Sequence, residues 1–210
     1  MLAPLWFFGF DSLMEFIGFA IASAVAYQAL KGYRLSKERT LLYLNLSFGL
    51  LGAGLLIEGL ANLVVLLVRF HRGFLFLSAF GYTIDFVAQF LAYGLLVFAY
   101  VQQTRNVGAQ VPIAVVAAAP VFFFFEHNAV TELILLFLLV YIATHTAINY
   151  NMNKSASALL VFGAFVSLSV AHLFFLLFTL APVFFPFAHV AQLFGFLLLL
   201  AMLVRVNHSE

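Results

Sequence analysis

The stretch SAFGYTIDFVAQFLAYGLLVFAY, residues 78–100, decides the fold of this chain. It is long and apolar enough to cross a bilayer, which takes ~20 apolar residues, yet Asp85 lies in its interior. An ionised carboxylate near the bilayer centre costs at least ~3 kcal/mol. Polar residues recur every three or four positions, which places them on one helical face. The stretch therefore predicts a membrane helix whose polar face meets a partner or a watery cavity. That face carries Ser78, Tyr82, Asp85, Gln89, Tyr93 and Tyr100.

The composition of the whole chain also indicates a membrane protein. Hydrophobic residues make up 66% and charged residues 8%, whereas soluble domains carry about 25% charged residues. The apolar runs are continuous, which favours helices over the alternating strands of a barrel. We therefore predict an all-α, polytopic integral membrane protein whose first partner is the lipid bilayer. The spans leave no room for a soluble catalytic domain, so a role other than catalysis is favoured, and a net charge of +1 gives no surface for nucleic acid.

Seven spans are predicted within a single heptahelical domain. They cover residues 12–30, 41–68, 76–102, 111–125, 129–150, 156–180 and 187–206. Asp11 or Ser12 is expected to cap the first helix, with Glu15 at the position of a capping-box carboxylate. Pro120 is expected to kink the fourth span.

The distribution of basic residues predicts the orientation. With the N-terminus outside, seven of the nine Lys and Arg residues fall on the inner side, and only Arg69 and Arg72 remain outside. Because positive charges are enriched in cytoplasmic loops, we expect the N-terminus outside and the C-terminus in the cytoplasm of a cell carrying this protein in its cell membrane. The inner set is Lys31, Arg34, Lys37, Arg39, Arg105, Lys154 and Arg205.

A depth count pairs two carboxyl groups. Glu58 lies 13 residues before His71, in the middle of an outer loop, and Asp85 lies 14 residues after it. With a rise of ~1.5 Å per residue, both fall about 15 Å deep, near the midplane of a ~30 Å core. Neighbouring carboxylates cannot both be ionised without a cation, so either they share a proton or a positive group lies between them.

These residues predict one polar cavity open to the outside. No Lys or Arg lies in the interior of a span, away from its ends, so a proton, a metal ion, a cationic ligand or a histidine must balance the charge. The predicted ligand-binding or proton-binding residues are Glu58, Asp85, Asn62, Tyr82, Gln89, His172 and Gln192, and the candidate metal ligands are His172 and His189. The depth count also sets Asn62 opposite Tyr82 and Gly54 opposite Gln89. The alternative is a structural network that clamps helices together.

Several other polar residues are expected to be structural. Bonding of His172 to a serine such as Ser169 or to a backbone carbonyl is the alternative to a functional role for that histidine. His189 and His145 lie near opposite interfaces, and a structural role is favoured for both. We interpret Asp11, Glu15, Glu126 and Glu132 as helix caps and surface charges, and Gly49, Gly52, Gly54 and Gly59 as a close-packing surface.

Chromophore and haem chemistry are constrained by the same residues. The last span contains no lysine, which argues against retinal bound as a Schiff base, and the chain has no Cys for thiolate sites. A b-type haem needs two axial ligands at matched depth. His145 and His172 differ by about 15 Å in depth, while His172 with His189 stays open.

Three hypotheses for function follow. The first is a protein that holds a proton, a cation or a small polar ligand at the carboxylate pair, for sensing or translocation. The second is an accessory or scaffold subunit that packs against other membrane subunits. The third is a redox subunit that carries a b-type haem or a metal ion.

Overall fold

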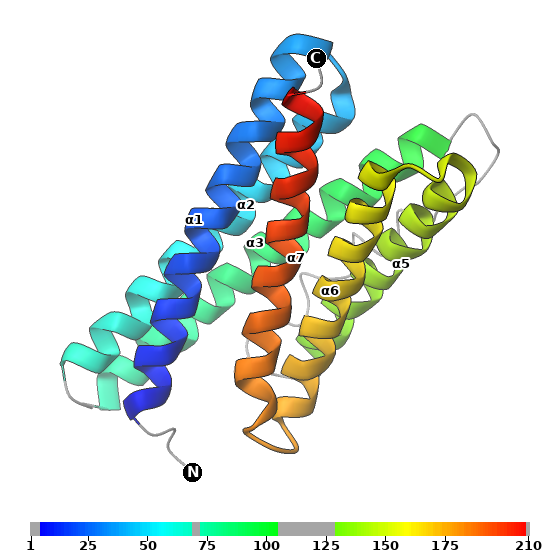
Figure 1. Cartoon of the computed structure of the whole chain (residues 1–210). Helices are drawn as coiled ribbons and strands as arrows, with labels where there is room; N and C mark the ends of the chain where they lie inside the picture. Colours follow the sequence, from blue (N-terminus) through cyan, green and yellow to red (C-terminus); the bar gives the residue numbers. More distant parts are fainter. Residues whose placement is uncertain (1–4, 69–71, 105–128, 209–210) are drawn as a thin grey trace.

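The computed structural model describes residues 5–68, 72–104 and 129–208, which form six long α-helices (Figure 1). All six are long and apolar enough to cross a membrane. The fourth predicted span, residues 111–125, lies outside the described residues. The helices are α1 (Leu5–Ser36), α2 (Arg39–Leu67), α3 (Arg72–Thr104), α5 (Ala129–Asn153), α6 (Ala156–Phe178) and α7 (Phe184–His208).

The described helices form a closed ring. Its order is α1, α2, α3, α5, α6 and α7, and α7 packs back against α1. We call the end where α1 begins the N-terminal end of the bundle, and the end where α7 finishes the C-terminal end (Figure 1). The α6–α7 turn lies at the N-terminal end, and the α1–α2 and α5–α6 turns lie at the C-terminal end.

Two pairs of neighbouring helices in the ring are parallel. On α3 and α5, Tyr82 contacts Thr131 and, further along both helices, Tyr100 stacks on His145. Helices α1 and α7 are likewise parallel, since Asp11 approaches His189 and Gln28 bonds Asn207. The end of α3 and the start of α5 therefore lie at opposite ends of the bundle.

The ring consists of two three-helix units, α1–α3 and α5–α7, with the same order and directions. Their first turns are alike. Lys37 and Lys154 both have left-handed backbones, with φ of 59° and 50°. Each amine lies over the ring of a tyrosine four residues earlier, Tyr33 at 5.9 Å and Tyr150 at 6.0 Å. The two hairpins thus repeat a local motif that the sequence analysis did not detect.

The two halves of the bundle differ in polarity. The C-terminal half is filled by buried apolar side chains such as Phe48, Ile142, Leu199 and Leu203. Most of the buried acidic and basic side chains lie in the N-terminal half. Large apolar side chains cover the outside, for example Phe137, which is 66% exposed. This arrangement suits a lipid environment, in which buried polar groups must satisfy one another.

Helix α1 differs from its predicted bounds. It begins at Leu5, before Asp11, so Asp11 and Glu15 lie inside the helix and the predicted cap is wrong. Apolar residues before Asp11 continue the helix, whereas a cap requires a non-helical backbone. At its other end α1 continues to Ser36 and includes Lys31 and Arg34, which were expected in a loop. Lys and Arg can remain in a helix near the membrane surface, because their long side chains carry the charge to the polar boundary.

Candidate functional site

A small cavity lies in the N-terminal half of the bundle, between all six described helices. Its volume is ≈ 20 Å³, which suits about one water molecule or one small ion. The lining side chains are mostly acidic, imidazole, amide or phenol groups. They are Asp11, Glu15, Glu58, Tyr82, Asp85, Gln89, Glu132, His172, Phe175, Phe185, His189 and Gln192.

Glu58 and Asp85 meet across the interface between α2 and α3, as the depth count predicted. Both carboxyl groups line the cavity, and the side-chain amide of Gln89 donates to Asp85. Both acids are buried, with exposures of 6% and 3%. Two carboxyl groups buried beside each other cannot both be ionised without a positive charge, so the pair requires a proton or a cation.

The close approach of α2 and α3 depends on two glycines. A Cβ atom at Gly54 would lie 2.6 Å from Oδ1 of Asp85, and a Cβ atom at Gly81 would lie 2.6 Å from Cβ of Ala61. Both distances are too short for real side chains. The glycines therefore allow the backbones to approach closely enough for the acidic pair to form.

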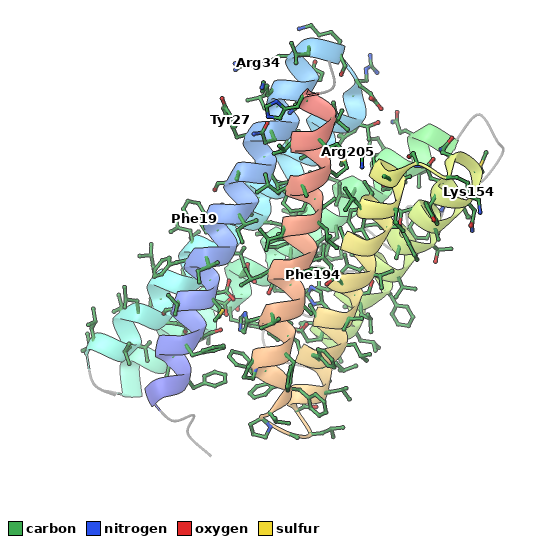
Figure 2. All side chains as sticks on the ribbon, in the orientation of Figure 1. Phe19, Tyr27, Arg34, Lys154, Phe194 and Arg205 are labelled. Atoms are coloured by element: carbon green, nitrogen blue, oxygen red, sulfur yellow. The ribbon has the colours of Figure 1, made fainter. Side chains whose placement is uncertain are left out.

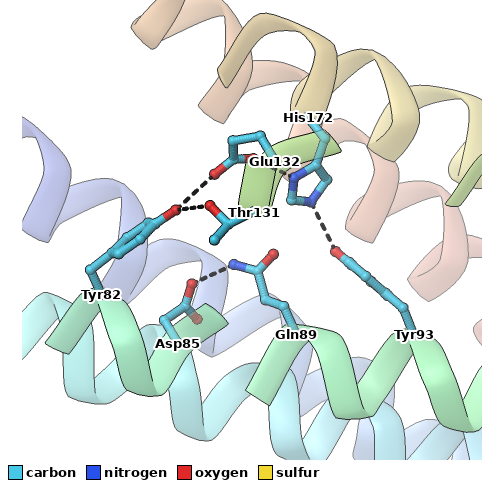
Figure 3. Close-up of polar contacts among 7 residues, drawn as sticks. All are labelled: Tyr82, Asp85, Gln89, Tyr93, Thr131, Glu132 and His172. Atoms are coloured by element: carbon cyan, nitrogen blue, oxygen red, sulfur yellow. Dashed lines mark hydrogen bonds and ion pairs between the residues drawn. The ribbon is translucent and has the colours of Figure 1, made fainter. Parts of the chain in front are cut away.

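Glu132 and His172 form a second polar pair, between α5 and α6 (Figure 3). Nδ1 of His172 lies 2.8 Å from Oε2 of Glu132, and its Nε2 lies 3.4 Å from the hydroxyl of Tyr93. The hydroxyl of Tyr82 donates to Oε1 of Glu132 at 3.2 Å and contacts Thr131 at 2.9 Å. These bonds join α3, α5 and α6 on one side of the cavity.

Two expectations about this pair are wrong. Glu132 was interpreted as a cap or surface charge, but it is 6% exposed and lines the cavity. Ser169 was the expected structural partner of His172, but its hydroxyl donates to the carbonyl oxygen of Phe165 one turn earlier. A serine in an apolar helix satisfies its hydroxyl within its own helix, which leaves the imidazole to the carboxylate.

His189 lies between two carboxyl groups of α1. Its Nε2 is 3.1 Å from Oδ1 of Asp11, and its Nδ1 is 3.7 Å from Oε1 of Glu15. Asp11 and Glu15 are each 5% exposed, so their interpretation as cap and surface charges is wrong. Because they are four residues apart in a helix, they share the face that meets α7.

Asn62 supports the cavity from behind rather than lining it. Its Nδ2 donates to Oδ2 of Asp11 at 2.6 Å, and its Oδ1 accepts from the hydroxyl of Ser78 at 2.6 Å. The expected neighbour, Tyr82, bonds Thr131 and Glu132 instead. Asn62 therefore positions Asp11.

Aromatic side chains surround the imidazole of His189. The ring centroids of Phe10, Phe175 and Phe185 lie 5.9, 5.1 and 4.5 Å from it, all in edge-to-face geometry. Phe7 stacks on Phe185 with a centroid distance of 4.2 Å. This cluster shields the polar groups at the N-terminal end of the bundle and lowers their local dielectric constant.

The charges of the cavity are unbalanced. Five carboxyl groups and two imidazoles line it, with no Lys or Arg among the described lining residues. Figure 2 shows Arg34, Lys154 and Arg205 toward the C-terminal end instead. Burying several ionised carboxylates without counter-charges is very costly. Protons or a small cation must therefore supply the positive charge.

Four polar atoms in the cavity also lack partners. Oδ1 of Asp85, Oε2 of Glu15, Oε1 of Gln89 and Nε2 of His189 have no hydrogen-bond partner among the described residues. The amide oxygen can only accept, a carboxyl oxygen accepts when it is ionised, and the nitrogen accepts in one tautomer. They need a water molecule or a cation in the space they enclose.

The structure gathers most of the predicted site residues. Glu58, Asp85, Tyr82, Gln89, His172 and Gln192 line the cavity, as does the metal-ligand candidate His189. The sequence analysis missed Asp11, Glu15 and Glu132 as cavity residues, and Glu126 lies outside the described part. The sequence does contain one sign that Glu15 and Glu132 are equivalent, because they lie the same number of residues before Lys37 and Lys154.

Comparison with known proteins gives no further guide. No family model, no curated protein and no solved structure matches this chain. We therefore infer the function from the residues of the site itself.

Proposed function

We propose that the protein holds a small cation, a proton or a metal ion, within the membrane, with Glu58 and Asp85 as its principal ligands. One observation carries the proposal. All six described helices direct acidic or hydrogen-bonding side chains into a single cavity of ≈ 20 Å³, with no Lys or Arg among the described residues that line it. Ionisable residues inside a membrane usually mark a site for ions or protons.

Sensing agrees better with this geometry than translocation. Buried apolar side chains such as Phe48, Phe165 and Leu199 fill most of the C-terminal half. A cation that enters from the N-terminal end meets this largely apolar core. Because every described helix contributes to the cavity, occupancy would change the packing of the whole ring, as a sensor requires.

The proposal includes the orientation of the protein in the membrane. Helices α3 and α5 are parallel, so the chain leaves α3 and enters α5 at opposite ends of the bundle, as seven spans require. Arg34, Lys154 and Arg205 gather toward the C-terminal end (Figure 2). These features support an outside N-terminus and a cytoplasmic C-terminus in the cell membrane.

Cation-dependent stability tests the proposal. Thermal unfolding of the purified protein in detergent is followed at graded pH and at graded Li⁺, Na⁺, Mg²⁺ and Ca²⁺ concentrations. A bound cation stabilises the folded state by ~2.7 kcal/mol at 100 times its Kd. The variants Glu58→Gln and Asp85→Asn should lose this response, while Glu38→Gln at an exposed turn should keep it. A full response in both cavity variants would assign the pair a purely structural role.

An accessory role is the second candidate, supported by an apolar groove on the outside of α5 and α6. The groove is lined by Leu136, Val140, Ala143, Thr144, Ala147, Phe162, Val166, Ser169, Val170 and Leu173. A lipid chain or a helix of another subunit fits such a surface. Stoichiometric co-purification of a membrane partner from native membranes would favour this candidate.

The third prediction, a redox subunit with a b-type haem, also uses residues of this cavity. Its candidate axial ligands, His172 and His189, both line it. Nδ1 of His172 is engaged by Glu132, as is usual for a histidine that ligates a metal through Nε2.

A further inference from the structure

A second set of ligands lies in the same cavity, between α1 and α7. We propose that Asp11, Glu15 and His189 bind one divalent transition-metal ion, with Zn²⁺ as the representative. One ligand atom of each residue lies within 4.8 Å of the other two. An imidazole nitrogen with two carboxylate oxygens is a donor set that such ions accept. The two carboxylates also match a charge of +2.

Two buried atoms of this group lack hydrogen-bond partners. Nε2 of His189 lies 3.1 Å from Oδ1 of Asp11, yet it has no hydrogen-bond partner. Adjacent ligands around one ion bound at ~2.0–2.1 Å are separated by about 2.9–3.4 Å. Oε2 of Glu15 is also unpartnered and buried. Two electron-pair donors at this spacing fit an ion between them better than a bond to each other.

Residues around the three ligand side chains hold them in fixed orientations. Asn62 holds Oδ2 of Asp11 at 2.6 Å, so Oδ1 remains for the ion. Ser78 holds Asn62 in turn. The edge-to-face contacts of Phe175 and Phe185 fix the plane of His189. Such outer contacts raise metal affinity because the ligands need not be reorganised on binding.

The other Glu–His pair provides an internal contrast. Nδ1 of His172 is bonded to Glu132, and its Nε2 contacts Tyr93, so both nitrogens are engaged. Among the described residues, only the group with His189 brings three such ligand atoms within 4.8 Å of one another. The inference thus goes beyond the proposed function, since it assigns a metal-selective subsite that does not include Glu58 or Asp85.

Metal titration of the full chain tests the inference. The protein is purified with a tag that lacks histidine, stripped with a chelator, and titrated with Zn²⁺ by calorimetry. We expect one Zn²⁺ per chain. Asp11→Asn, Glu15→Gln and His189→Asn should each weaken binding by at least ~100-fold, and Asn62→Ala by about 10–100-fold. The controls Glu38→Gln and His208→Asn, at exposed positions outside the cavity, should leave the Zn²⁺ affinity within a few-fold of wild type.

A cysteine variant keeps the test decisive if a ligand variant fails to fold. His189→Cys retains a metal ligand, and the chain has no other Cys. With Co²⁺ as the probe, this variant should gain a thiolate-to-metal absorption band in the near ultraviolet that the wild type lacks. Absence of Zn²⁺ binding by wild type, absence of the band in folded Co²⁺-treated His189→Cys, or equal loss of affinity in the Glu38 and His208 controls would overturn the inference.

The two proposals fail separately. If Glu58→Gln and Asp85→Asn lose the cation response but keep Zn²⁺ affinity, both proposals stand. If the wild type shows the cation response but binds no Zn²⁺, the metal subsite is wrong and the proposed function stands. If Zn²⁺ binds through Asp11, Glu15 and His189 while both acid-pair variants respond as wild type, only the proposed function is wrong.

Discussion

Gly54 is the residue on which the acidic pair depends most directly. A Cβ atom there would lie 2.6 Å from Oδ1 of Asp85 and 2.8 Å from Cβ of Ala88. We predict that Gly54→Ala pushes α2 away from α3 and lowers the free energy of unfolding by ~1–3 kcal/mol, the usual cost of overpacking. It should also abolish the cation response. Thermal unfolding with and without cation measures both effects.

Gly49 is the matched control on the same helix. A Cβ atom at this position meets no atom within 4 Å. Gly49→Ala should be neutral or should stabilise by up to ~1 kcal/mol, because alanine is the better helix former. Equal behaviour of the two variants would show that the α2–α3 crossing does not limit the geometry of the pair.

The contact between Glu132 and His172 is predicted to be energetically coupled. The residues are buried and 2.8 Å apart, so removal of either one leaves the other without its partner. Each alanine variant should cost ~3–5 kcal/mol, and the double variant should cost less than the sum by about 1–3 kcal/mol. Equilibrium unfolding in detergent measures this cycle. His145, whose ring lies 4.5 Å from that of Tyr141 in a tilted contact, is the control, and additivity of the Glu132 and His172 variants would contradict the prediction.

Residue positions could be predicted from the sequence only where a short loop fixes relative depth. Glu58 and Asp85 flank one hairpin, so counting residues was enough to pair them. Asp11, Glu15 and His189 belong to α1 and α7, which are distant in sequence, and no count relates them. The motif around Asp11 also resembles a capping box, which hid two buried acids. Only the packing of the ring brings these residues to the histidine.

At the scale of elements, the type of each described helix was predictable and its ends were not. Continuous apolar runs are sufficient for a membrane helix. The ends depend on local contacts, as at the start of α6. There the hydroxyl of Ser155 accepts a hydrogen bond from the backbone N–H of Ala158 at 3.1 Å.

This cap gives a prediction for one helix. Ser155→Ala should lower the free energy of unfolding by ~1 kcal/mol, because an N–H group of the first turn loses its acceptor. Ser169→Ala, on the same helix, removes a hydroxyl that only bonds its own helix. It should change stability by less than about 0.5 kcal/mol. Chemical unfolding of both variants measures the difference, and equal effects would argue against a stabilising cap.

At the scale of the whole molecule, the two three-helix units explain why acidic groups recur around one cavity. Glu15 and Glu132 occupy equivalent places before the turns at Lys37 and Lys154, and each meets a histidine. Both histidines belong to the α5–α7 unit, and their surroundings differ: His189 also meets Asp11 of α1, whereas Glu132 also accepts from Tyr82 of α3. The acids of the two similar hairpins thus lie on two chemically different sides of the same site.

The absence of Cys allows the predicted topology to be tested by single substitutions. Glu38 and Ser155 lie in exposed turns at the C-terminal end, and Val183, 60% exposed, lies in the turn at the N-terminal end. In intact cells, an impermeant maleimide should label Val183→Cys at once and Glu38→Cys and Ser155→Cys only after permeabilisation. Seven spans put Glu38 and Ser155 on one side, because four crossings separate them, whereas six spans would put them on opposite sides. Labelling of Ser155→Cys but not Glu38→Cys in intact cells would therefore contradict both the predicted fourth span and the parallel arrangement of α3 and α5.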